Sequence, residues 1–126
     1  MSLPDWLHSP HVRTSIDYLS HTGPVYIATP YSAWAERGEA QAAYDAAVSW
    51  QAIIARHGYT GVSPIVLGHP MHLPEWSHAR WLEWCRPILD SSASVFIPPI
   101  EGRWESVGVK WEAERALSQC KPVVVG

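Results

Sequence analysis

The sequence predicts an α/β fold built on a parallel β-sheet, and three observations support this prediction. Short apolar runs, such as residues 25–28 and 94–97, are nearly uninterrupted, as expected of strands buried on both faces. Longer segments of helical character separate these runs. The length of 126 residues suits one domain. We therefore expect a single domain over residues 1–126, a flavodoxin-like or Rossmann-like open parallel sheet of four to five strands with helices on both faces.

The first half of the chain is expected to hold one strand between two helices. A short helix is predicted around residues 12–19, and the first strand at residues 25–28. Residues 33–57 are rich in Ala, Glu and Gln and predict a long helix that Ser32 could cap. Gly38 weakens the first turns of this helix.

The second half continues the alternation of strands and helices. Residues 60–67 predict a second strand that is broken or turned at Pro64. Residues 74–89 predict a helix with Pro74 in its first turn and a kink at Pro87. The remaining predicted elements are a strand at 94–97, a helix at 107–119 and a strand at 122–125.

Composition excludes several classes of partner. The formal net charge of −3 and the pI near 6.1 leave no basic stripe for a nucleic-acid polymer. No apolar run approaches the roughly 20 residues of a membrane span. The N-terminal residues do not resemble a signal peptide, and Cys85 and Cys120 give no disulfide framework. We expect a cytoplasmic protein that uses neither membrane nor nucleic-acid polymer.

The segments that follow the first and third predicted strands are expected to form one binding mouth. Parallel sheets bind ligands beyond the carboxyl ends of their strands, where the strand order switches. Residues 98–108 follow the third strand, and four candidate substrate-binding residues follow the first: Thr29, Pro30, Tyr31 and Ser32. A small-molecule site is therefore predicted at this edge of the sheet.

The most informative motif lies at the entrance of the predicted helix 107–119. Ser106 and Gly108 at a helix start leave backbone N–H groups free for an anion. Glu112 lies more than one turn inside the helix, where its carboxylate can face the same crevice. Glu114 points about 200° away and suits a solvated role. Ser106, Gly108 and Glu112 therefore predict chemistry on a small phosphorylated or sugar-bearing molecule.

Other side chains are candidates for the same pocket. Tyr26 and Tyr31 could orient a catalytic carboxylate through their hydroxyls, or could simply be core residues. Trp104 and Trp111 flank the Ser/Gly turn and could stack on a base, although packing explains most of the eight tryptophans.

A histidine cluster and the absence of nucleotide motifs bear on metals and cofactors. His69, His72, Glu75 and His78 suggest metal ligands, but Pro70 and Pro74 interrupt the helix that would align them. We favour a polar loop in which His69 reaches the pocket, and expect no metal. There is no P-loop and no GxGxxG, so no cofactor is expected.

Three segments together resemble the nucleoside 2-deoxyribosyltransferase-like superfamily. Val25-Tyr26-Ile27-Ala28-Thr29-Pro30-Tyr31 resembles its first-strand signature, and Ser63-Pro64-Ile65 its second-strand segment. The pattern Ser106-x-Gly108-x-x-x-Glu112, with Ala116 and Lys121-Pro122-Val123, is similar to its last helix and strand. The resemblance spans residues 25–125 and fits an uncharacterised small bacterial branch.

The resemblance implies a role for several residues. The Glu at the position of Glu112 is the nucleophile in characterised relatives, and the Tyr at the position of Tyr26 holds it. The position of Ser106 is Asp in the deoxyribosyltransferases, but it is Ser in the related 2′-deoxynucleoside 5′-phosphate N-hydrolases, where it lines a phosphate pocket. Relatives are homo-oligomers whose neighbouring subunits complete the site.

The chain departs from the family pattern at the general acid. The usual Asp positions fall near Arg86 and Ser94, and Asp90 is the nearby carboxylate, displaced by about one helical turn. The leading hypothesis is cleavage or transfer at the N-glycosidic bond of a nucleoside or nucleoside 5′-monophosphate, with Glu112 and Tyr26 catalytic and Asp90 the candidate acid. The alternatives are a catalytically weak nucleotide-binding module and a metal-dependent hydrolase at His69, His72 and His78.

Overall fold

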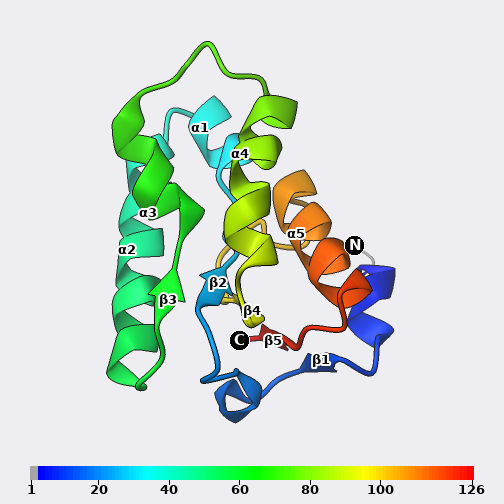
Figure 1. Ribbon diagram of the computed structural model, residues 1–126. Helices are drawn as coiled ribbons and strands as arrows, with labels where there is room; N and C mark the ends of the chain where they lie inside the picture. The colour runs from blue at the N-terminus through cyan, green and yellow to red at the C-terminus, as the bar shows by residue number, and fades with distance from the viewer. Residues whose placement is uncertain (1–2) are drawn as a thin grey trace.

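The computed structural model describes residues 3–126 and places five parallel strands in one sheet (Figure 1). Their order is β1-β5-β4-β2-β3. The strands are β1 (Val12–Arg13), β2 (Val25–Ile27), β3 (Gly61–Val62), β4 (Ser94–Ile97) and β5 (Val123–Val125). This open parallel sheet with its flanking helices confirms the predicted α/β class, flavodoxin-like or Rossmann-like.

The strand order reverses at β2. Tyr26 is in register with Val62 of β3 on one side and with Val95 of β4 on the other. After β2, the chain places β3 on one side of β2. It then places β4 on the other side, with β5 next to β4. Such a reversal opens a crevice at the carboxyl ends of the two central strands. A ligand site is therefore expected at the ends of β2 and β4.

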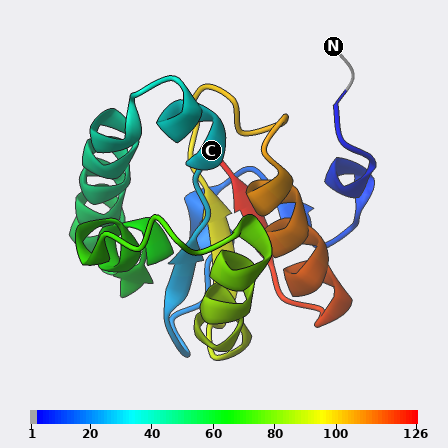
Figure 2. The same ribbon diagram turned by 90° about the horizontal axis from the view of Figure 1, so that it is seen from above.

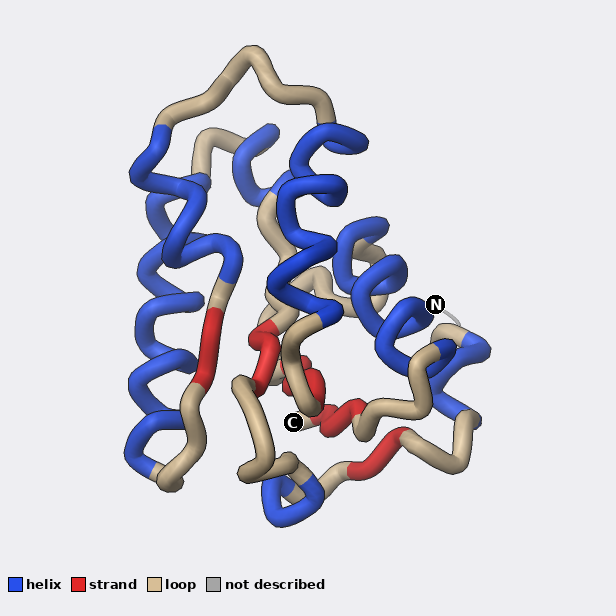
Figure 3. The backbone as a smooth tube through the Cα atoms, viewed as in Figure 1, coloured by secondary structure: helices blue, strands red, loops and turns tan. Residues whose placement is uncertain are grey.

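Helices of very different length connect these short strands (Figure 3). Ser63, Ser77 and Ser106 each accept a hydrogen bond from a backbone N–H three residues on and so begin three of the helices. The α-helices are α1 (Ser32–Glu36), α2 (Ala40–Arg56), α3 (Pro64–Gly68), α4 (His78–Asp90) and α5 (Val107–Ser118). The 3-10 helices are η1 (Asp5–His8), η2 (Ile16–Tyr18) and η3 (His69–Met71).

Alternate residues of the strands face two separate cores. Tyr26 of β2 faces the core that contains α4 and α5, together with Val95 of β4. Val25 and Ile27 face the opposite core, where Ile54 of α2 packs. Viewed from above, α2 lies on one side of the strands, while α4 and α5 lie on the other (Figure 2). Because β2 is buried on both faces, its apolar run is uninterrupted.

The long helix predicted over residues 33–57 is instead two helices. Gly38 has a φ of +77°, a left-handed conformation that interrupts a right-handed helix. The N–H of Glu39 bonds to the carbonyl of Trp34, which closes α1 before α2 begins. Tyr31, not Ser32, is the residue before α1, and Ser32 is its first residue. The break turns α1 towards the carboxyl ends of the strands (Figure 1).

Three further element predictions were wrong in part. Residues 12–19 do not form a helix, because β1 pairs in parallel with β5 and only η2 is helical. Residues 60–67 contain just the two-residue β3, since Pro64 occupies the first turn of α3. The helix predicted from residue 74 begins at His78, where Ser77 provides the cap.

Candidate active site

A cavity of about 420 Å³ opens where the topology predicts a ligand site. We call it the inner cavity, and it lies between the end of β2, the inner face of α4 and the entrance of α5. Seven of the candidate site residues line it: Thr29, Pro30, Tyr31, Ser32, Ser106, Gly108 and Glu112. The segments expected to meet at one mouth therefore do meet.

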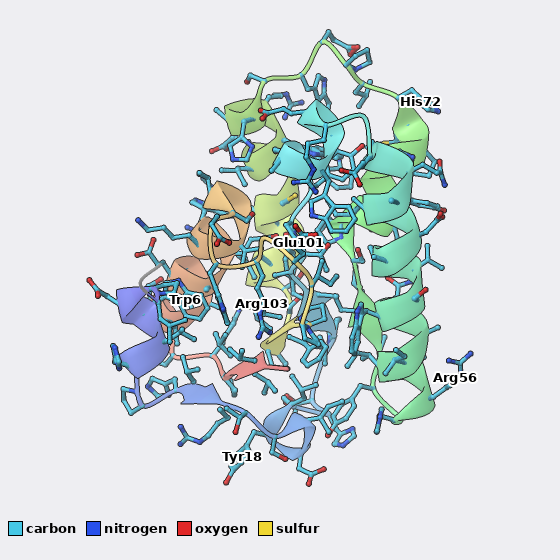
Figure 4. The ribbon with its side chains drawn as sticks, turned by 180° about the vertical axis from the view of Figure 1, so that it is seen from behind. Trp6, Tyr18, Arg56, His72, Glu101 and Arg103 are labelled. Carbon is cyan, nitrogen blue, oxygen red and sulfur yellow. The ribbon has the colours of Figure 1, made fainter. Side chains whose placement is uncertain are left out.

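Two hydrogen bonds hold the loop after β4 over this mouth. The indole Nε1 of Trp34 in α1 donates to the carbonyl of Glu101, at 3.1 Å. Arg103 Nη1 donates to the carbonyl of Gly126 at 2.7 Å, beyond the end of β5. Figure 4 shows Glu101 and Arg103 on this loop. The loop is thus tied to both neighbouring segments.

Glu112 lines the inner cavity, and Tyr26, which is fully buried and does not line it, is bonded to Glu112 from behind. Glu112 is only 6% exposed, and the Tyr26 hydroxyl donates a hydrogen bond to its Oε2. Tyr26 points from the central strand towards α5, while Glu112 points from α5 towards the sheet. Cys85 of α4 is buried beside Tyr26 and lines the same cavity. A carboxylate held in this way can reach a ligand only through the cavity.

Burial changes the proton affinity of these groups. Desolvation raises the pKa of Glu112 to about 8, although the hydrogen bond from Tyr26 favours the charged form. Burial and the neighbouring carboxylate raise the pKa of Tyr26 well above its ordinary value. Burial raises the pKa of the Cys85 thiol to about 12, so this thiol stays protonated. A strongly shifted carboxyl group in a cleft is a mark of a functional site.

Several hydrogen-bond donors around the inner cavity are free. The Ser106 hydroxyl accepts from the N–H of Val109, at 3.2 Å. Within the described chain, the N–H groups of Val107 and Gly108 have no hydrogen-bond partner. The hydroxyl of Thr29, a residue 6% exposed, likewise has none among residues 3–126. A buried polar group without a partner is costly. The N–H groups of Val107 and Gly108 at the start of α5 are the donors available to a ligand.

The charge of the inner cavity could not be read from sequence. Glu36 of α1 and Glu105 join Glu112 in the lining, and no Lys or Arg of residues 3–126 does so. Trp81 and Cys85 of α4 are further lining residues that sequence reasoning did not select. No local motif signals them, because the break at Gly38 and the packing of α4 bring them to the mouth.

A second, larger cavity of about 800 Å³ adjoins the first. We call it the aromatic cavity. It shares Tyr31, Ser32, Glu36, His78 and Trp81 with the inner cavity. His69, His72 and Trp76 line it further out. Figure 4 shows His72 on the chain segment that arches over this end of the molecule.

His69 belongs to the aromatic cavity rather than to the inner one. Its Nδ1 lies 2.8 Å from the Tyr31 hydroxyl, and its ring stacks on Tyr44. No group of three or more His, Cys, Asp or Glu side chains in residues 3–126 is arranged to hold a metal ion. The residues His69, His72 and His78 therefore line a wall of this cavity.

The structure does not bring Asp90 to the candidate active site. Asp90 ends α4, and its two carboxylate oxygens accept hydrogen bonds from Arg115 at 2.8 and 2.7 Å. Gln119 donates a further hydrogen bond to it. These contacts hold the pKa of Asp90 well below its ordinary value. A carboxylate paired in this way is a structural link between α4 and α5, and Asp90 lines neither cavity.

Trp104 is also placed away from both cavities. Its ring packs on Trp6 with a centroid distance of 5.8 Å, and the Arg103 guanidinium lies over its face. Figure 4 shows Trp6 beside α5. Trp111 packs partly buried against the same core. Both tryptophans therefore serve packing within the chain, and neither lines a cavity.

Comparison with known proteins gives one family. The model of a domain of unknown function, DUF1937, matches residues 23–126. The chain belongs to the DUF1937 family. No curated protein matches the chain. The DUF1937 region contains every residue of both cavities, while η1, β1 and η2 precede it.

No helix within residues 3–126 of this DUF1937 protein is long and apolar enough to cross a membrane.

Proposed function

We propose that the protein cleaves or transfers the N-glycosidic bond of a nucleoside, with Glu112 as the nucleophile. The observation that supports this most directly is the buried Glu112 carboxyl group, bonded to Tyr26 and facing a cavity at the strand-order switch. The resemblance to nucleoside 2-deoxyribosyltransferases over residues 25–125 suggests the same roles for these two residues.

The proposed reaction has two displacement steps. The Glu112 carboxylate attacks the anomeric carbon, and the bond from that carbon to the base nitrogen breaks with its electron pair going to the base. An acid protonates the departing base, and a glycosyl ester of Glu112 remains. Water, or a second base, then attacks the same carbon and releases the carboxylate. Tyr26 donates to the carboxylate and keeps it in position.

The proposal requires an acid other than Asp90. Glu36 and Glu105 both have exposed carboxyl groups in the lining of the inner cavity. Glu36 also lines the aromatic cavity, so its carboxyl group lies at the junction of the two spaces. We assign the acid role to Glu36, because a leaving group that enters the aromatic cavity passes this side chain.

The charges of the inner cavity favour an unphosphorylated nucleoside over the 5′-monophosphate. Glu36, Glu105 and Glu112 contribute carboxyl groups, whereas the lining formed by the described residues has no Lys or Arg. The Ser106 hydroxyl already accepts from Val109, which leaves two N–H groups at the helix entrance. Two N–H groups suit a sugar hydroxyl as well as an anion.

The second candidate is a nucleoside-binding module without turnover. The pairing of Asp90 with Arg115 favours it, because that carboxylate cannot act on a leaving base. The family resemblance further suggests a homo-oligomer with shared sites in the cytoplasm. Sedimentation velocity across a concentration series tests the oligomer, and a monomer at every concentration would rule it out.

Incubation with a panel of deoxynucleosides and their 5′-monophosphates tests the function. Free base, measured by chromatography, should appear from nucleosides with the wild type and fall at least 100-fold with Glu112→Gln. Glu114→Gln is the matched control, since Glu114 is exposed on the same helix and lines neither cavity. Release that survives Glu112→Gln contradicts the nucleophile assignment. Ligand-induced stabilisation without release supports the binding module, and loss of release with a chelator supports metal-dependent hydrolysis.

A further inference from the structure

The aromatic cavity is walled by rings whose positions are fixed. Trp81 packs so closely on Gly68 that a Cβ at Gly68 would lie 1.9 Å from the Trp81 ring. Trp76 meets Trp81 edge-on at 5.6 Å between ring centroids, and Arg80 lies over the Trp76 ring at 4.3 Å. His69 and His72 contribute rings to the same lining. The cavity therefore has several flat ring surfaces, and these side chains lose little conformational entropy when a ligand binds. Such surfaces suit a planar ring system.

The polar groups of this cavity include hydrogen-bond acceptors. The Gln41 amide donates its Nε2 to Asp45, which leaves its Oε1 to accept from His69 Nε2 at 3.4 Å. In the tautomer that carries its proton on Nε2, His69 accepts through Nδ1 from the Tyr31 hydroxyl, at 2.8 Å. The Tyr31 oxygen keeps its lone pairs for another donor, and Glu36 adds a carboxyl group whose C=O oxygen also accepts.

The charges of the lining residues restrict the class of ligand further. No Lys or Arg in the described part of the chain lines the aromatic cavity, and Glu36 is its one acidic side chain. A phosphate or carboxylate would find no Lys or Arg of the described residues within the lining to pair with, because Arg80 lies over the Trp76 ring but outside the lining. A neutral ring with N–H groups matches both the flat walls and the acceptors.

We propose that the aromatic cavity binds a planar nitrogen heterocycle of the nucleobase class, stacked against Trp76 and Trp81 and bonded to Tyr31 and Glu36. The ring could be the leaving base of the nucleoside or the acceptor base in a transfer, since the recognition chemistry is the same. The biological role of this base site rests on the proposed function. Binding of a free base can nevertheless be measured independently of nucleoside cleavage.

Calorimetric titration with free adenine, hypoxanthine, cytosine and thymine tests the inference without any turnover. At least one base should bind, and Trp76→Leu should weaken its binding about tenfold, as expected from the loss of one stacking surface. Trp104→Leu is the control, because Trp104 packs on Trp6 and lines neither cavity. Its affinity should stay within twofold of wild type.

A second variant covers the case in which Trp76→Leu fails to fold. His72→Asn removes a ring from the wall, while Asn tolerates the left-handed backbone of this position, φ 51°. It should weaken base binding at least threefold. The inference is overturned if none of the four bases binds, or if neither wall variant changes the affinity.

The Glu112→Gln variant separates this inference from the proposed function. It should bind free base as tightly as wild type, because Glu112 lines the inner cavity alone. Base binding without any release from nucleosides would refute the function and leave the inference standing. Competition between nucleoside and free base distinguishes the two roles of the site. If a nucleoside displaces the free base, the cavity holds the leaving base. If nucleoside and free base bind at the same time, the cavity holds the acceptor base.

Discussion

The buried environment of Glu112 disfavours the ionised form of its carboxyl group. Its side chain is buried between α5 and the sheet, and its pKa of about 8 means that much of it is protonated at neutral pH. In the proposed reaction Glu112 must lose that proton, and the hydroxyl of Tyr26 supplies the one hydrogen bond to the carboxylate within the described residues. The hydrogen bond from Tyr26 lowers the pKa of Glu112, so under our proposal Tyr26 favours the reactive, ionised form.

Replacement of Tyr26 by Phe tests this dependence. The hydrogen bond from Tyr26 lowers the pKa of Glu112, so its loss should raise that pKa by about one unit. The rising limb of kcat/KM against pH should shift to higher pH, with about a tenfold loss at pH 7. A carbon-13 NMR titration of the Glu112 carboxyl group measures the same change without turnover. An unchanged titration midpoint would refute the role of Tyr26.

The same carboxyl group should couple folding to pH. Its pKa is about 8 in the folded chain, against an ordinary value of 4.5, so the folded state binds the proton more tightly. Its stabilising contribution is complete below pH 4.5 and is lost as the pH rises through about 8. Urea unfolding at pH 5, 7 and 9 should show wild type losing stability relative to Glu112→Gln, by about 1.4 kcal/mol for each pH step of one between the two pKa values. Parallel curves for the two proteins would contradict a buried carboxyl group.

At the scale of elements, sequence pattern predicted the long regular pieces and missed those set by tertiary contact. The uninterrupted run of β4 and the Ser-capped α5 were predicted within a residue. By contrast, β1 and β3 have two residues each, too few for a periodic signal, and pairing with their neighbours defines them. The residues of the candidate site divide in the same way, into those that a local motif predicts and those that tertiary packing places there. The motif of α5 indicated Glu112, but Cys85 and Trp81 reach the cavities only because α4 packs where it does.

The contact between α3 and α4 gives a prediction about stability. Gly68→Ala places a Cβ within 1.9 Å of Trp81 and should destabilise the fold by roughly 1–3 kcal/mol. Gly108→Ala is the contrast, because the nearest atoms lie 3.8 Å away and α5 gains a better helix former. It should leave stability unchanged or raise it by up to about 1 kcal/mol. Chemical denaturation measures both, and equal effects would show that Trp81 is not held against Gly68.

At the scale of the whole molecule, the segment before residue 23 completes a sheet that the family region leaves with an open edge. β1 pairs in parallel with β5, Trp6 is buried against Trp104, and Leu19 packs in the core next to α2. Without this segment, β5 becomes an edge strand of three valines.

Deletion of residues 1–22 should therefore lower the melting temperature by several degrees and promote association of the protein. Differential scanning calorimetry and light scattering measure the two effects. A deletion variant that melts and scatters as the full chain does would show that the segment adds nothing to the core. The candidate active site lies at the carboxyl end of β2, and β5 and β4 separate β2 from β1 in the sheet, so base binding should persist wherever the variant stays folded.

The central claim is that Glu112 forms a covalent bond to the anomeric carbon of a nucleoside. A nucleoside with fluorine at C2 of the sugar destabilises both displacement transition states and lets the ester accumulate when the base is a good leaving group. Intact-mass spectrometry should show the glycosyl adduct on wild type and on Glu114→Gln, with the label on the peptide that contains Glu112, and none on Glu112→Gln. Turnover of nucleosides without any such adduct, or an adduct on another residue, would contradict the account.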